Sequence, residues 1–174
     1  PNLFPPTQKT FTIKTFDRKS ITNFKETLYS IKEDKISLIL NFPNNPTGYT
    51  PSDVELNSLV DIISTYAKEN KNKQLIIVSD DAYFGLFFEK NHKTPTLSAT
   101  YKLAENENCL IIKLDGITKE YYSWGLRIGF ITYYTKNDEL RQLLLEKTQG
   151  FLRSTTSSPS NLSQQIALRL LESS

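Results

Sequence analysis

Three stretches of the chain are almost continuously apolar and rich in β-branched residues: 36–42, 74–80 and 109–114. Short apolar runs of this kind are typical of strands that are buried on both faces of a sheet. A fourth apolar run, residues 126–134, contains more aromatic side chains and is also predicted to be a strand. Residues 11–17 alternate between apolar and polar side chains, which predicts an edge strand.

The segment between the first two apolar runs has a helical period instead. The residues that fall on one face of this helix are Leu56, Leu59, Val60, Ile63 and Tyr66. At its start, Thr50 is a suitable N-cap, Pro51 suits the first helical position, and Asp53 completes a pattern like a capping box. The helix is therefore predicted to begin at about Pro51.

The order strand, helix, strand predicts that the first two strands pair in parallel through a right-handed crossover. Further helices are predicted at about residues 21–32, 138–153 and 160–172. Residues 116–125 are too few for a crossover helix, so the strand from Leu126 is expected to run antiparallel to its predecessor or to lie elsewhere in the sheet. The predicted fold class is α/β, with three layers (α/β/α) around a mostly parallel sheet.

Composition narrows the possible partners. The 174 residues are enough for one domain with a sizeable core, and a net charge of +2 gives no reason to expect a nucleic-acid or membrane surface.

The single cysteine, Cys109, lies in an apolar run, so a disulfide framework is excluded and a buried thiol is expected. The single histidine, His92, lies in a polar segment, which disfavours histidine triads and multi-histidine metal sites. We found no secretory signal or membrane span and therefore expect a cytoplasmic location.

Ligands of a mostly parallel sheet bind beyond the carboxyl ends of its strands, so the residues that follow each strand are the candidates. After the first strand, Asn45-Pro46-Thr47-Gly48 forms either an ordinary strand-to-helix turn or a stiff segment that directs the Asn45 amide at a ligand. After the second, Asp80 and Asp81 either cap a solvated turn, or one of them is partly buried beside a cation. Tyr83 lies three residues after Asp80 and can point at the same ligand.

The third strand leads to a lysine and an arginine. A single lysine in a loop, such as Lys119, is usually exposed to solvent, but near a desolvated pocket it loses its charge easily and becomes a nucleophile for Schiff-base chemistry. Arg127 stands inside the apolar run "GLRIGF" and requires an anion, for which a phosphate is a natural partner.

Taken together, these motifs resemble the class I/II, aspartate-aminotransferase-like family of fold type I pyridoxal-phosphate enzymes. The matching segments occur in the family's order: "NPTG" at residues 45–48, "DDAY" at 80–83, then Lys119 and "GLRIGF" at 125–130. The resemblance extends over essentially the whole chain, and the order of three separate motifs makes it specific.

The resemblance implies a role for each of these residues. Lys119 is expected to be catalytic, binding pyridoxal 5'-phosphate as a Schiff base and moving a proton at the substrate α-carbon. Asp80 is expected to pair with the pyridine nitrogen, while Tyr83 and Asn45 hydrogen-bond the phenolic oxygen of the ring. Arg127 is expected to bind the phosphate.

The sequence departs from the family pattern at one position of the phosphate site. The family usually has a serine three residues before the lysine, whereas this chain has Gly116. Thr118 offers a hydroxyl beside Lys119 and is included among the expected cofactor-binding residues.

The resemblance also identifies residues 1–174 as one domain, the second half of the cofactor-binding large domain. It places the N-terminal part of that domain and a small C-terminal domain outside this chain, and with them a phosphate loop, a ring-stacking aromatic residue and a substrate-binding arginine. The chain alone is therefore expected to have little or no activity.

The implied function is transfer of an amino group between an amino acid and a 2-oxo acid, in a parent protein that is a homodimer. Two alternatives stay open: another fold type I enzyme, such as a C–S lyase, decarboxylase or synthase, or a non-catalytic binding or regulatory module.

Overall fold

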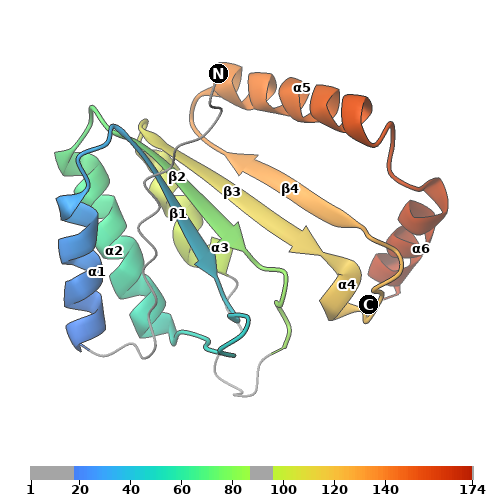
Figure 1. Ribbon diagram of the computed structural model, residues 1–174, viewed down its shortest axis with the longest axis horizontal. Helices are drawn as coiled ribbons and strands as arrows, with labels where there is room; N and C mark the ends of the chain where they lie inside the picture. The colour runs from blue at the N-terminus through green and yellow to red at the C-terminus, as the bar shows by residue number, and fades with distance from the viewer. Residues whose placement is uncertain (1–17, 87–95, 174) are drawn as a thin grey trace.

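The computed structural model describes residues 18–86 and 96–173 (Figure 1). The elements are α1 (Arg18–Ser30), β1 (Lys35–Asn41), α2 (Asp53–Glu69), β2 (Gln74–Asp80), α3 (Thr96–Thr100), the 3-10 helix η1 (Tyr101–Glu105), β3 (Cys109–Gly116), α4 (Ile117–Glu120), β4 (Gly129–Tyr134), α5 (Asp138–Thr155) and α6 (Asn161–Glu172). The edge strand predicted at residues 11–17 and the polar segment around His92 lie outside the described residues.

The four strands form one sheet in the order β1-β2-β3-β4. β1, β2 and β3 are parallel to one another, and β4 is antiparallel to β3. Both predictions about strand direction are therefore confirmed. The mostly parallel arrangement brings the carboxyl ends of β1, β2 and β3 to one edge of the sheet, where the turns that follow them meet (Figure 1).

One face of the sheet carries most of the hydrophobic core. Alternate strand residues, including Ile36, Leu75, Ile77 and Ile111, pack there against buried residues of α1, α2 and η1. Cys109 belongs to this cluster, as predicted, and burial raises the pKa of its thiol to about 11. The core thus fixes the strands firmly at their amino-terminal ends and centres.

Helices lie on both faces of the sheet, which agrees with the predicted three-layer α/β/α arrangement. The register places Ile39, Val78, Ile112 and Tyr133 in one row on the face opposite the main core. The Tyr133 hydroxyl lies 2.6 Å from Oγ1 of Thr148, which brings α5 onto this face beside β4. Ile39, at the other end of the row, is 71% exposed.

The start of α2 differs from the prediction. The N-cap is Ser52, not Thr50, and the helix begins at Asp53. The Ser52 side chain accepts a hydrogen bond from the Glu55 backbone N–H, and the Glu55 carboxylate accepts one from the Ser52 N–H at 2.6 Å. This complete capping box has the longer glutamate side chain at its third position, which reaches back to the cap more easily than Asp53 reaches Thr50.

Across residues 18–86 and 96–173, none of the helices combines the length and the apolar character that a membrane crossing requires.

Candidate functional site

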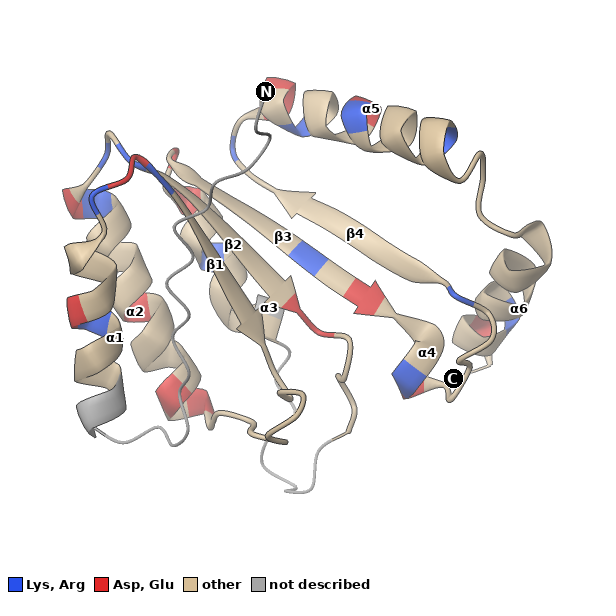
Figure 2. Cartoon of the chain, in the orientation of Figure 1, with Lys and Arg blue, Asp and Glu red and all other residues tan. Residues whose placement is uncertain are grey.

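A hollow of about 510 Å³ opens where β2 and β3 end and β4 begins. Its lining includes Tyr83, Thr118, Lys119 and Arg127, four of the residues predicted from the sequence. Figure 2 shows acidic residues at the carboxyl ends of β2 and β3, with basic residues in α4 and just before β4. The hollow therefore lies where the strand-end rule predicts a ligand.

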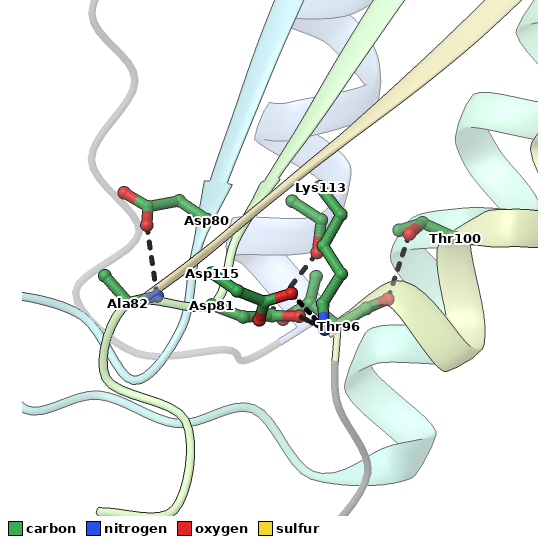
Figure 3. Close-up of polar contacts among 8 residues, drawn as sticks. Asp80, Asp81, Ala82, Thr96, Thr100, Lys113 and Asp115 are labelled. Atoms are coloured by element: carbon green, nitrogen blue, oxygen red, sulfur yellow. Dashed lines mark hydrogen bonds and ion pairs between the residues drawn. The ribbon is translucent and has the colours of Figure 1, made fainter. Parts of the chain in front are cut away.

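Asp80 is the last residue of β2, and two hydrogen bonds fix its carboxylate. Asn41, its register partner on β1, donates from Nδ2 to Oδ2 at 3.0 Å. The backbone N–H of Ala82 donates to Oδ1 at 3.2 Å (Figure 3). Each carboxylate oxygen accepts one bond, which orients the group and leaves lone pairs for a further donor.

Asn45, Tyr83 and Lys119 converge beyond the strand ends. Asn45 donates from Nδ2 to the Tyr83 hydroxyl at 3.0 Å. The Lys119 Nζ lies 5.2 Å from the centroid of the Tyr83 ring, within range of a cation–π contact. The structure thus brings together an amide, a phenol and an amine from three separate turns, as the sequence predicted.

Lys119 belongs to the single-turn helix α4, which follows β3 directly. Its side chain is half-buried, and in the described part of the chain no hydrogen bond or ion pair engages its amine. The amine is therefore available for a ligand in the hollow. Thr118, the preceding residue, also lines the hollow.

Two glycines bring β3 and β4 close together beside Lys119. Gly116 and Gly129 are register partners, and a Cβ atom added at Gly116 would lie 3.3 Å from the Ile128 carbonyl oxygen. A Cβ atom at Gly129 would lie 3.2 Å from the Asp115 carbonyl oxygen. A serine at position 116 would thus require the neighbouring backbone of Ile128 to shift by a few tenths of an ångström.

Arg127 lies in the turn before β4 and not within a strand. The apolar run predicted a strand from Leu126, but β4 begins at Gly129, because Arg127 adopts a left-handed φ of 53° that breaks the extended backbone. Its Nη1 donates to the Trp124 carbonyl at 3.4 Å, and its side chain is exposed at the hollow. In residues 18–86 and 96–173 no carboxylate forms an ion pair with this guanidinium.

Of the two aspartates after β2, Asp81 is the buried one. Its side chain is 1% exposed and has a cationic partner, Lys113 on β3, with Nζ to Oδ2 at 3.8 Å. Desolvation by burial raises the pKa of Asp81, Lys113 lowers it, and Asp115 raises it further. Sequence reasoning predicted a partner for such a carboxylate but did not identify Lys113, although a lysine inside the apolar run "CLIIKL" was a signal for it.

The described part of the chain contains no group of three or more His, Cys, Asp or Glu side chains arranged to hold a metal ion.

Comparison with known proteins points to one family. Residues 9–174 match the model of the family described as aminotransferase class I and II. The chain is 30% identical over 158 residues to an aspartate aminotransferase of Thermococcus kodakarensis, an alignment that covers 91% of this chain and 35% of that protein.

Two solved structures share the fold. An aminotransferase from Anaerococcus prevotii superposes with a TM-score of 0.74 at 24% identity, covering 86% of this chain and 37% of the other. An aromatic-amino-acid aminotransferase from Burkholderia pseudomallei, described as covalently bound to pyridoxal phosphate, superposes with a TM-score of 0.59 at 18% identity, covering 81% and 33%. The chain thus spans about a third of the length of these relatives.

Proposed function

Because the chain belongs to the aminotransferase class I and II family, we propose that it carries the cofactor site of a transaminase, which transfers an amino group between an amino acid and a 2-oxo acid. We further propose that pyridoxal 5'-phosphate binds there as a Schiff base on Lys119. The observation that supports this most directly is the convergence of the Lys119 amine on Tyr83, whose hydroxyl accepts a hydrogen bond from Asn45.

The residues that line the hollow, together with the neighbouring Asp80 and Asn45, fit this cofactor by their chemistry. Pyridoxal phosphate presents an aldehyde, a pyridine nitrogen, a phenolic oxygen and a phosphate. The chain offers, at one edge of the sheet, a primary amine on Lys119, a carboxylate on Asp80, a phenol and an amide on Tyr83 and Asn45, and a guanidinium on Arg127. The covalently bound cofactor named for the Burkholderia pseudomallei relative supports the same assignment.

Asp80 and Arg127 would hold the two charged ends of the cofactor. The Asp80 carboxylate, fixed by Asn41 and Ala82, is oriented to accept a hydrogen bond from a ring N–H without reorganising. The Arg127 guanidinium has donors left over from its contact with Trp124, and these suit a phosphate. When bound, the cofactor supplies an electron sink for bond breaking at the substrate α-carbon.

Lys119 and Tyr83 would act at the reacting end. We propose that the Lys119 Nζ, as a free amine, takes a proton from the substrate α-carbon and returns it to the carbon on the other side of the substrate nitrogen. Tyr83 carries the aromatic face nearest to this amine, and Asn45 fixes the direction of its hydroxyl. These contacts limit the positions that the amine and the phenol can adopt. Less conformational entropy is then lost when the two groups are fixed for the reaction.

The test is to add pyridoxal phosphate, reduce with borohydride and map the modified peptides by mass spectrometry. We expect a pyridoxyl adduct on Lys119 that is absent from Lys119→Ala. Lys136, an exposed lysine that is 54% accessible and pairs with Glu105, provides the matched control, because a specific site leaves it unlabelled. Equal labelling of Lys119 and Lys136 would show that the amine of Lys119 is not in a formed site and would refute the proposal.

Turnover is tested separately with aspartate as the amino donor and a 2-oxo acid as the acceptor. Aspartate is the first donor to assay because the Thermococcus kodakarensis relative is named an aspartate aminotransferase. We expect any transaminase activity to be abolished in Lys119→Ala, since this variant lacks the proposed base.

A further inference from the structure

Lys113 lies between two carboxylates on the face of the sheet that carries the main core. Its Nζ is 2.7 Å from Oδ2 of Asp115 and 3.8 Å from Oδ2 of Asp81. The Lys113 side chain is 20% exposed, that of Asp115 30% and that of Asp81 only 1%. Figure 3 shows Lys113 reaching toward both carboxylates beside Thr96 of α3. Lys113, Asp81 and Asp115 are called the ion cluster below.

The ion cluster lies where the two segments that carry the candidate site begin. Asp81 directly follows Asp80, and Asp115, near the end of β3, is four residues before Lys119. Lys113 and Asp115 both belong to β3, so the contact between Lys113 and Asp81 is the one that links the turn of residues 80–86 to β3 and to the segment of residues 115–120. A backbone hydrogen bond lies beside it, because the Asp81 N–H donates to the Leu114 carbonyl at 3.0 Å.

The ion cluster is poorly suited to serve stability alone. Burial of Asp81 removes a carboxylate from water, and Lys113 offsets only part of that cost at 3.8 Å. Among the residues that the structure describes, the other groups that face Asp81 are the hydroxyl of Ser79, 3.4 Å from its Oδ1, the Thr96 side chain and the like charge of Asp115. A neutral residue at position 81 would avoid the free-energy cost of removing a carboxylate from water. Folding stability alone therefore does not account for a charged residue at this position.

We propose that Lys113 is a positioning residue of the cofactor site, which holds the turn after Asp80 against β3, and so against the segment carrying Lys119, by binding Asp81, while Asp115 on the same strand holds the Lys113 amine in place. The role of Lys113 in cofactor binding rests on the proposed function. The link that Lys113 makes between the turn of residues 80–86 and β3 does not rest on it, because that link exists in the chain without a cofactor.

The test compares four variants of the full chain. Lys113→Met removes the cation at similar side-chain length, and Lys113→Arg keeps it. The double variant Asp81→Asn/Lys113→Met removes the buried charge together with its partner, so no unpaired buried charge remains. Lys136→Met breaks the exposed ion pair with Glu105 and is the matched control.

Two measurements distinguish a positioning role of Lys113 from a contribution to the overall stability of the fold. Amide hydrogen exchange, measured without cofactor, reports on opening of residues 81–86 and 115–120, and the Asp81 amide is the most direct probe because it bonds to Leu114. The dissociation constant of pyridoxal phosphate reports on the assembled site. Both are measured at a temperature well below the melting temperature of every variant.

We expect Lys113→Met to increase exchange in both segments about tenfold while the amides of β1 stay protected. The double variant should regain melting temperature but keep the fast exchange and bind pyridoxal phosphate about tenfold more weakly than the unaltered chain. Lys113→Arg should behave like the unaltered chain, and Lys136→Met should change neither measurement.

The inference would be overturned if the double variant recovered slow exchange together with its melting temperature, or if Lys113→Met matched Lys136→Met. Failure of the unaltered chain to bind pyridoxal phosphate, with exchange changing as expected, would instead count against the proposed function and leave the link between the two turns established.

Discussion

Asn41 and Asp80, register partners at the ends of β1 and β2, are joined by a hydrogen bond of 3.0 Å from the Asn41 amide to the Asp80 carboxylate. The oxygen of the same Asn41 side chain accepts from the Asn45 backbone N–H at 3.3 Å. One side chain at the end of β1 therefore supports two proposed cofactor ligands, Asp80 on the neighbouring strand and Asn45 in its own following turn.

This relationship predicts the effect of Asn41→Ala. Asn41→Ala loses these two hydrogen bonds and a third, which the Asn44 Nδ2 donates to the Asn41 oxygen at 3.1 Å. This loss should weaken binding of pyridoxal phosphate about tenfold and lower the free energy of unfolding by about 1–2 kcal/mol. The dissociation constant and a urea titration measure the two effects. Asn72→Ala, at an exposed position in the turn before β2, is the control and should change neither quantity. Equal affinity in the two variants would show that Asn41 does not orient Asp80.

The hydroxyl and the ring of Tyr83 should make separable contributions. Tyr83→Phe removes the acceptor for the Asn45 amide but keeps the ring near Lys119, so we expect weaker cofactor binding with a change of less than about 1 kcal/mol in the free energy of unfolding. Tyr83→Ala should weaken binding further. Tyr122→Phe alters an exposed tyrosine just after α4 and provides the control. Affinity that is equal in Tyr83→Phe and Tyr122→Phe would contradict a role for the hydroxyl.

Much of this fold follows from periodicity alone. Near-continuous apolar runs predicted β1, β2 and β3. The short connection after β3 predicted that β4 runs antiparallel to β3 or lies elsewhere in the sheet, and the first of these is observed. The rule that ligands bind at the carboxyl ends of parallel strands selects Asn45, Tyr83 and Lys119 from the sequence, and the structure places these three together.

What sequence reasoning missed depends on which face or conformation a residue adopts. A run that is apolar on both faces does not reveal which face Lys113 shares, and only the register shows that it lies on the side of Asp81. Arg127 was expected within a strand because its neighbours are apolar, yet its left-handed backbone places it in the turn. The choice between Thr50 and Ser52 as the cap depended on side-chain reach, which a motif does not specify.

The close approach of β3 and β4 can be tested at two glycines. Gly129→Ala places a Cβ atom 3.2 Å from the Asp115 carbonyl oxygen, so we expect a loss of about 1–3 kcal/mol in the free energy of unfolding. Gly150→Ala lies in exposed helix α5 with nothing near the added atom and should gain up to about 1 kcal/mol from helix propensity. Chemical denaturation measures both. A Gly129→Ala variant as stable as the unaltered chain would contradict the observed strand spacing.

The corrected start of α2 leads to opposite expectations for two neighbouring residues. Ser52→Ala removes the N-cap and its half of the capping box, which should cost about 1 kcal/mol. Thr50→Ala should leave the free energy of unfolding within about 0.5 kcal/mol, because Thr50 lies outside the cap. Thermal unfolding of the two variants decides between them, and a larger loss for Thr50→Ala would restore the assignment predicted from the sequence.

Asp81 should make stability depend on pH in an unusual direction. The pKa of its carboxyl is raised in the fold, chiefly by desolvation, so the folded chain binds a proton more tightly than the unfolded chain. The contribution of Asp81 to stability is therefore greatest below its unfolded pKa and is lost as the pH rises through the raised folded pKa. Asp81→Asn removes the buried carboxylate and its cost of desolvation. The substitution should therefore raise the free energy of unfolding at pH 7 by about 1 kcal/mol, while Lys113 keeps its contact with Asp115.

The measurement is the difference in unfolding free energy between Asp81→Asn and the unaltered chain from pH 4 to pH 8. We expect the advantage of Asp81→Asn to grow with pH and to be smallest at the acidic end, because the folded chain holds a proton on Asp81 more tightly than the unfolded chain does. Asp53→Asn, an exposed aspartate in the first turn of α2, controls for the change in net charge and should not show this trend. An advantage that shrinks as the pH rises would mean that Lys113 stabilises the Asp81 carboxylate by more than its burial costs, and the argument that the ion cluster serves position rather than stability would then fail.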